Sequence, residues 1–369
     1  MEELPKGVLI IGSVPLKNAE EVFRVCGQKL GSCLISLPDG ETGDRLSWLG
    51  HQRARFDRHP QLERPRPEER ERGGTVALYR IKRGSKLRFD SLGYSDFARD
   101  SYALFERFQA EGIIPQSVRF QVSLPTPLNM LSFFDSADGE EVEVALVEAF
   151  TREIETMVRH IPPEKLAIQW DMSREVTILR GFHLLDSPDA LTSVISKLND
   201  ISAAIPESAL LGTHLCCGDR HYKPIQELKD LGSLVNFASV LTKELNHRLD
   251  WVQMPVPPDR DDLDYFKPLA DLAMGPTKLY LGLVHHNDGV EGALGRIRTA
   301  QKVLPDFGVT TECGLGRRRP ETIPALLDTF LEYLAHSALP RHDIVRKQSN
   351  CYTEMRSIWT PVATQKRKK

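Results

Sequence analysis

Short runs of β-branched and aliphatic residues recur along the whole chain and alternate with longer stretches of mixed polarity. Within the runs the apolar positions are nearly continuous rather than alternating, which is typical of parallel strands that helices cover on both faces. The pattern therefore predicts eight strands. They cover residues 8–13, 33–37, 118–123, 166–171, 210–216, 249–254, 278–285 and 308–313.

Between the predicted strands, apolar residues repeat at three and four positions, as they do on one face of a helix. The clearest stripes run over residues 142–158, 191–201, 290–297 and 323–334, and Ser187-Pro188 is a start signal for the second of them. Strand and helix that alternate eight times predict an α/β fold, a closed (β/α)8 TIM barrel. A doubly wound open sheet is the alternative, and it usually has fewer units.

One connection is much longer than the rest, because the chain takes roughly twice a normal repeat between the second and third predicted strands. The excess spans about residues 51–92 and includes a part rich in Arg, Glu and Pro over 53–74. Two further runs, 75–83 and 86–90, predict a hairpin. We expect this excursion to lie over the barrel mouth, either as a lid or as a solvated loop without catalytic duty.

The domain organisation is predicted to be simple, with one barrel domain over residues 1–350 and a C-terminal extension over 351–369. The extension ends in Lys366-Arg367-Lys368-Lys369, which is either a solvated basic tail or a nuclear signal. The N-terminus lacks the basic start and apolar core of a signal peptide. No stretch approaches the roughly 20 apolar residues that span a bilayer.

Composition and charge narrow the classes of partner. The formal net charge is −3 and the pI is about 6.4, so no global basic field attracts nucleic acid or an anionic membrane. The six cysteines are too sparse for a disulfide scaffold at this length. We interpret them as reduced thiols of a cytoplasmic protein that acts on a small molecule. Nothing in the sequence indicates an oligomeric state.

Polar and ionisable residues stand at the ends of nearly all the predicted strands. In a barrel of this kind the chemistry lies at the carboxyl ends of the strands, where eight loops meet above a packed core. These positions are therefore the candidate site. They include Ser13, Asp39, Glu41, Ser123, Asp171, His214, Cys216, Gln253, His285, Asp288 and Cys313.

The spacing of His214, Cys216 and Cys313 suggests a metal site. His214 and Cys216 stand two apart at the end of an apolar run, so they project from the same face of a strand. Cys313 ends another run, and if the two runs are neighbouring strands, three ligands converge. Such a set suits zinc with an open fourth position. The alternative is a hydrogen-bonded core histidine with cysteines that act as small buried hydrophobes.

Six short motifs occur along the chain in an order that resembles a known enzyme family. They are Ile-Gly-Ser-Val-Pro at 11–15, Asp-Gly-Glu at 39–41, Leu-Pro-Thr-Pro-Leu-Asn-Met-Leu-Ser-Phe at 124–133, Gln-Trp-Asp at 169–171, His-Leu-Cys at 214–216 and Cys-Gly-Leu at 313–315. As an ordered set they resemble the cobalamin-independent methionine synthase barrel, in the superfamily that also holds uroporphyrinogen decarboxylase and the coenzyme M methyltransferases. The resemblance covers essentially the whole chain, which has one barrel, as in the short members.

The resemblance implies roles for several of these residues. A zinc ion would be held by His214, Cys216 and Cys313, and a substrate thiolate at its open position would attack a methyl group. Ser13, Glu41 and Asp171 would hold the amino acid portion of homocysteine.

The resemblance also implies that His285 acts as a general acid, with Asp288 to orient it. The Glu41 and Asp171 carboxylates suit an ammonium group, but they also suit an acid/base pair. The alternative is that the same two carboxylates have no functional role and form surface ion pairs with Arg45 and Arg174.

The chain departs from the family at three positions. Gln253 stands where the family has a glutamate ligand of zinc, and a neutral ligand set makes the ion a better Lewis acid. Asp39 replaces the histidine of the His-Gly-Glu segment, and Phe133 replaces the tryptophan associated with folate. We nevertheless assign Asp39, Ser123, Phe133, Gln253 and Arg317 to substrate binding.

These observations favour zinc-dependent alkyl (methyl) transfer to a thiol such as homocysteine. The alternative is a lyase or hydrolase that cleaves a C–C bond or decarboxylates a small carbonyl or carboxylate substrate. In that case Arg317, in the turn of Arg317, Arg318 and Arg319, binds the acid group, unless the turn is merely solvated. A third class is a catalytically silent binding protein on an enzyme scaffold.

Overall fold

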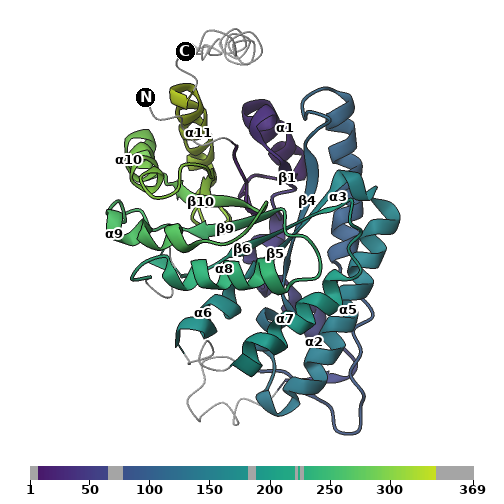
Figure 1. Cartoon of the computed structure of the whole chain (residues 1–369). Helices are drawn as coiled ribbons and strands as arrows, with labels where there is room; N and C mark the ends of the chain where they lie inside the picture. The colour runs from purple at the N-terminus through teal and green to yellow at the C-terminus, as the bar shows by residue number, and fades with distance from the viewer. Residues whose placement is uncertain (1–6, 65–77, 182–187, 221–222, 225–227, 338–369) are drawn as a thin grey trace, which may run out of the picture.

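The computed structural model describes residues 7–64, 78–181, 188–220, 223–224 and 228–337. It is an α/β fold in which parallel strands gather at the centre and helices surround them (Figure 1). Among the described helices, none combines the length and the apolar character needed to cross a membrane.

The central sheet is curled and has seven parallel strands, each formed by one of the predicted apolar runs. In sheet order the strands are β1 (Ser36–Pro38), β4 (Arg119–Pro125), β5 (Leu166–Met172), β6 (Leu210–Leu215), β9 (Trp251–Pro255), β10 (Lys278–Val284) and β11 (Gly308–Thr311). Every one of these pairs is parallel, as the continuous apolar runs predicted.

The predicted first strand, residues 8–13, connects the two edges of this sheet. Val8 makes an isolated parallel bridge to Leu34, just before β1, and another to Val309 in β11. Its backbone nitrogen donates to the Cys33 carbonyl at 3.0 Å, and the Leu9 nitrogen donates to the Val309 carbonyl at 3.1 Å. The N-terminal segment thus lies between both edge strands of the curled sheet.

The four helical stripes predicted from the sequence are confirmed as α5, α7, α10 and α11. Pro188 is the first residue of α7, whereas Ser187 of the start signal lies outside the described residues. Figure 1 shows α3 next to α5 and α10 next to α11 on the outside of the strands. The helices are α1 (Ala19–Leu30), α2 (Arg53–Asp57), α3 (Tyr94–Ala110), α4 (Pro127–Met130), α5 (Gly139–His160), α6 (Ser173–Gly181), α7 (Pro188–Ser202), α8 (Gly232–Glu244), α9 (Leu263–Phe266), α10 (Gly289–Gln301) and α11 (Ile323–Ser337).

Two apolar regions hold the fold together. The larger one fills the space between the strands and the surrounding helices. The smaller one consists of Leu9 of the N-terminal segment, Ala167 of β5, Trp251 of β9 and Tyr280 of β10. The Trp251 ring fits only because its partner in register is Gly212, where an added Cβ would lie 1.8 Å from the indole. This packed layer closes the interior below the strand ends.

The predicted hairpin within the excursion is wrong. The strand β3 (Arg80–Ile81) pairs antiparallel with β2 (Leu62–Glu63), and residues 86–90 form no strand. In that run the backbone of Leu87 donates instead to the Glu141 carboxylate at 2.9 Å. Residues 65–77 lie outside the described part of the chain. A second small ribbon, not predicted, pairs β7 (Asp219–Arg220) with β8 (Lys223–Pro224).

Aromatic packing, rather than strand pairing, organises the excursion. The Phe56 ring lies 5.1 to 5.7 Å from four other aromatic rings, so the excursion is fixed against the residues that follow β4. Burying large aromatic rings in edge-to-face contact outweighs the few hydrogen bonds of a short hairpin. The four partner rings are Tyr79, Phe89, Phe133 and Phe134.

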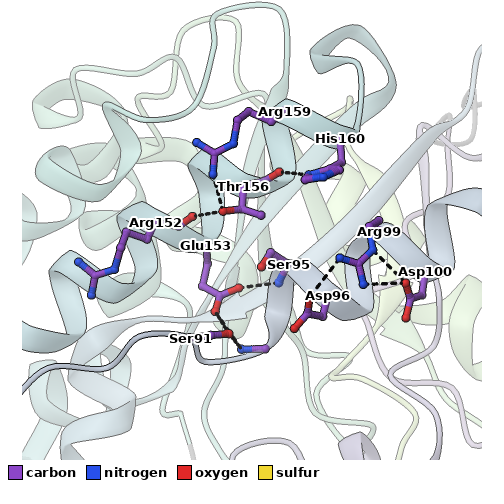
Figure 2. A network of polar contacts seen from close by, with 11 residues as sticks. Ser91, Ser95, Asp96, Arg99, Asp100, Arg152, Glu153, Thr156, Arg159 and His160 are labelled. Atoms are coloured by element: carbon purple, nitrogen blue, oxygen red, sulfur yellow. Dashed lines mark hydrogen bonds and ion pairs between the residues drawn. The ribbon is translucent and has the colours of Figure 1, made fainter.

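A buried carboxylate connects the end of the excursion to α5 (Figure 2). Glu153 is 3% exposed and accepts hydrogen bonds from the backbone of Leu92, Gly93 and Ser95 and from the Ser91 hydroxyl, at 2.5 to 3.0 Å. The residue that precedes α3 is Gly93, with φ +82°, which has no side chain to cap the helix. Glu153 therefore supplies from another helix the anion that the start of α3 needs.

We predict that Glu153→Gln lowers the free energy of unfolding by about 2 kcal/mol or more, because the amide nitrogen faces donors and the charge is lost. Chemical denaturation measures the change. Glu155→Gln, an exposed substitution on the same helix, is the matched control and should be near neutral. Equal stabilities of the two variants would contradict a structural role for Glu153.

Candidate metal centre and its cavity

His214, Cys216 and Cys313, which we call the ligand trio, meet at one point beyond the strand ends. Their ligand atoms all lie within 4.8 Å of one another. The two Sγ atoms are 3.7 Å apart, and Cys313 Sγ is 3.6 Å from His214 Nε2. Tetrahedral zinc with bonds of ~2.3 Å to sulfur and ~2.1 Å to nitrogen requires donors roughly 3.8 and 3.6 Å apart. The spacing of the trio fits that geometry.

The curl of the sheet, not strand adjacency, brings the trio together. The sequence suggested that the two ligand-bearing runs would be neighbouring strands, but β9 and β10 lie between β6 and β11. His214 is the penultimate residue of β6, Cys216 comes directly after the strand, and Cys313 lies two residues beyond β11. Because the sheet is curved, side chains from its separated strands point toward a common interior.

His214 and Cys313 both favour their protonated forms when no cation is bound. Burial lowers the pKa of His214, but the hydrogen bond and charge of Cys313 more than offset this and raise it to about 9. The hydrogen bond to Cys216, followed by burial, raises the pKa of Cys313 well above its usual value. A divalent cation would have to displace these protons, as it does in other sites of this kind.

The trio forms part of the wall of a cavity of about 110 Å³. The N-terminal segment, the loop after β1, the end of β5 and the turn after β11 complete the wall. The Ser13 hydroxyl accepts a hydrogen bond of 3.1 Å from the Gly316 backbone, which fixes two of these segments to each other. Among the predicted site residues, the cavity brings together Ser13, Glu41, Asp171, Arg317, His214, Cys216 and Cys313.

Two carboxyl groups, the half-buried Glu41 and the buried Asp171, line this cavity, and neither forms an ion pair with an arginine of the described part of the chain. Arg45 pairs with Asp39 at 2.6 Å rather than with Glu41, and Asp171 accepts from Gln169 at 2.9 Å. Burial, and then the charge of Asp171, raise the pKa of Glu41 well above its usual value. Burial raises the pKa of Asp171 to about 6. Such a pair attracts an ammonium group or holds a proton near neutral pH.

Asp39 and Ser123 line a second, smaller cavity of about 20 Å³, which shares Glu41 and Trp48 with the first. Besides the ion pair with Arg45, Asp39 accepts from the Ser101 hydroxyl at 2.6 Å. The Ser123 hydroxyl donates to the Ile11 carbonyl at 2.9 Å. Both side chains therefore use their polar atoms to shape the wall, and substrate binding by them stays a prediction.

Three predicted site residues do not line either of the two cavities, and their assignment to the site stays a prediction. Phe133 belongs to the aromatic cluster of the excursion, 4.8 Å below the Arg53 guanidinium. His285 is 2% exposed and its Nε2 bonds the Val256 carbonyl at 2.9 Å. Burial lowers the pKa of His285 to about 3, so a neutral ring, not a general acid, is present near pH 7. Asp288 forms an ion pair of 2.5 Å with the buried Arg296.

Gln253 also does not line either cavity, and its assignment to substrate binding stays a prediction. Its side chain is completely buried behind His214 and contacts the Nδ1 side of that ring.

Sequence reasoning missed Trp48 and the support under Asp171. Trp48 lies in both cavity walls, its side chain hydrogen-bonds Asp171, and its backbone has φ +49°. Asn129 donates to the Asp171 carbonyl at 2.9 Å and to Glu175 at 3.3 Å, and Thr126 also donates to Glu175. The motif over 124–133 contained the signal for this network.

We predict a pH-dependent effect of Glu175→Gln. Burial raises the pKa of Glu175 from 4.5 to about 7, so between these values the folded protein binds a proton that the unfolded chain has lost. The contribution of Glu175 to the free energy of unfolding therefore falls as the pH rises from 4.5 to 7, by up to roughly 3 kcal/mol. The stability of Glu175→Gln relative to the parent should thus increase between pH 5 and pH 8, measured by urea unfolding. A pH-independent difference would contradict it, and Glu155→Gln serves as the control.

Comparisons with known proteins agree with this fold. No family model matches the chain, and no curated protein matches it either. Among solved structures, a protein assigned as a vitamin-B12-independent methionine synthase from Listeria monocytogenes aligns over 92% of this chain and 100% of its own, with a TM-score of 0.56 and 15% identity.

A B12-independent methionine synthase from Shewanella sp. W3-18-1, in complex with selenomethionine, aligns over 91% of this chain and 99% of its own, with a TM-score of 0.57 and 14% identity. Identities at this level establish shared architecture alone. The resemblance seen in the ordered motifs is thereby confirmed for the fold: the chain has the architecture of the B12-independent methionine synthases.

Proposed function

We propose that this chain is a zinc-dependent enzyme that transfers a methyl group to a small thiol such as homocysteine. The observation that carries the proposal is the ligand trio, whose two sulfurs and one imidazole nitrogen have tetrahedral spacing and face a cavity. Two thiols and an imidazole are donors that zinc prefers.

The trio supplies three of the four positions of a tetrahedral zinc site. All three residues line the cavity, so a small molecule in the cavity reaches the fourth position. Bound there, zinc would lower the pKa of a substrate thiol and make it a thiolate near neutral pH. His214, Cys216 and Cys313 would hold the ion, while the rest of the wall binds and orients the substrate.

The other side of the cavity suits the amino acid portion of such a thiol. Glu41 and Asp171 form an acidic wall that favours an ammonium group. Ser13 and Arg317, on the opposite segments, offer a hydroxyl and a cation for a carboxylate. That the Shewanella protein binds selenomethionine, an amino acid with a chalcogen in its side chain, supports an amino acid ligand here too.

The position of the N-terminal segment in the fold supports the same proposal. We regard residues 8–13 as the stave that closes a (β/α)8 barrel, because Val8 bridges both edges of the sheet. Closure places the N-terminal Ser13 beside the Cys313 turn, where Leu315 donates to the Ser13 carbonyl at 2.7 Å.

One observation favours a second candidate, a lyase or hydrolase on the same scaffold. A buried Asp171 with its pKa near 6 exchanges a proton easily at neutral pH, as a general acid or base does. Arg317 would then bind the acid group of a small carbonyl or carboxylate substrate.

Metal content tests the first part of the proposal. Purified protein is expected to bind about one zinc ion per chain by mass spectrometry of its metals, and Cys216→Ala should lose it. Cys217→Ala is the matched control, because this neighbouring buried cysteine packs in the apolar core and is not in the trio. Equal loss of zinc from both variants, or no zinc in the parent, would refute the site.

Ligand binding tests the second part. Homocysteine is expected to perturb the absorption of a cobalt-substituted site, and Asp171→Asn should weaken its binding roughly 10- to 100-fold, because a charge-assisted hydrogen bond to the ammonium is lost. The binding of 4-mercaptobutyrate, which lacks the ammonium, should change little. If only keto acids or carboxylates perturb the cobalt site, the lyase or hydrolase replaces the methyltransferase.

A further inference from the structure

Gln253 lies directly behind the metal site and is completely buried. It belongs to β9, where it pairs in parallel register with His214 of β6, so the two side chains project side by side. Its amide oxygen contacts His214 Nδ1. Its amide nitrogen donates to the carbonyls of Thr311 and Glu312 at 3.2 and 3.4 Å.

These contacts determine which way the amide points. In the opposite orientation the Gln253 oxygen would face two carbonyl oxygens in a buried site, and neither of them can donate to it. The oxygen is therefore fixed on the side of His214. Because an amide oxygen only accepts, His214 Nδ1 must carry the hydrogen.

The same contacts connect the two halves of the ligand trio. The carbonyls that hold the Gln253 amide belong to the end of β11 and the residue just before Cys313. The side chain thus joins the strand that carries His214 to the turn that carries Cys313. When a cation displaces the second proton of His214, the proton on Nδ1 stays and Nε2 supplies the lone pair; Nε2 is the atom that lies 3.6 Å from Cys313 Sγ.

We infer that Gln253 is not a metal ligand but the positioning residue of the metal site: it fixes His214 as the Nδ1–H tautomer and presents Nε2 to the cation. The inference rests on the proposed zinc function and deepens it. Partners that hold the second ring nitrogen of a ligating histidine orient the ring and typically contribute 10- to 100-fold to metal affinity. A neutral amide does so here without adding a carboxylate to the ligand set.

The test compares Gln253→Met with Gln109→Met. Gln109 is a matched control, because it is also buried and its amide also donates to two carbonyls, those of Pro115 and Val118, but on the far helix α3. Zinc affinity is measured by competition with a chelator at fixed pH. Gln253→Met should bind zinc roughly 10- to 100-fold more weakly, whereas Gln109→Met should remain within about twofold of the parent.

A second measurement needs no substitution at Gln253. Nitrogen-15 spectra of histidine-labelled, zinc-bound protein should show His214 with its proton on Nδ1 and the metal on Nε2, with the signal assigned by its loss in His214→Gln. A proton on Nε2, or a folded Gln253→Met with unchanged affinity, would overturn the inference and leave the metal site standing. A parent chain that binds no zinc would overturn both.

Discussion

The curl of the parallel sheet is the constraint on which the site depends. His214 lies in β6 and Cys313 just beyond β11, and the strands β9 and β10 separate the two. Only a curved sheet therefore brings their side chains within 3.6 Å. Below them the layer of Leu9, Ala167, Trp251 and Tyr280 fills the interior and leaves the space at the strand ends as the cavity. The packing that stabilises the sheet thus also sets the spacing of the ligands.

The loop after β1 has a strained backbone and lines the same cavity as the ligand trio. Glu41 and Trp48 both have positive φ, +46° and +49°, which is costly for residues other than glycine. The Asp39–Arg45 ion pair and the hydrogen bond from Ser101 to Asp39 hold the loop in this form. As a result Glu41 is held near Asp171. Burial and the charge of Asp171 raise the affinity of Glu41 for a proton, and burial does the same for Asp171.

Much of this arrangement could be predicted from the sequence, for identifiable reasons. Continuous apolar runs give buried parallel strands wherever they occur, and the spacing of His214 and Cys216 follows from the two-residue period of a strand. Position at the strand ends identified four further candidate site residues, and the structure places all of them at one cavity: Ser13, Glu41, Asp171 and Cys313.

What could not be predicted depends on contacts between distant segments. The excursion follows the packing of the Phe56 ring rather than its local strand pattern. His285 stands at a strand end, as the ligands do, but it turns to the Val256 carbonyl, and Asp288 turns to Arg296. The contact of Gln253 with His214 needs the strand register, which a single sequence does not give.

Zinc-edge X-ray absorption of the metal-loaded protein tests the central claim most directly. The ligand trio predicts a four-coordinate shell with two sulfur atoms at ~2.3 Å and one imidazole nitrogen at ~2.1 Å, and a third sulfur when homocysteine is added. A shell made only of oxygen and nitrogen, or one with fewer than two sulfur atoms, would contradict it.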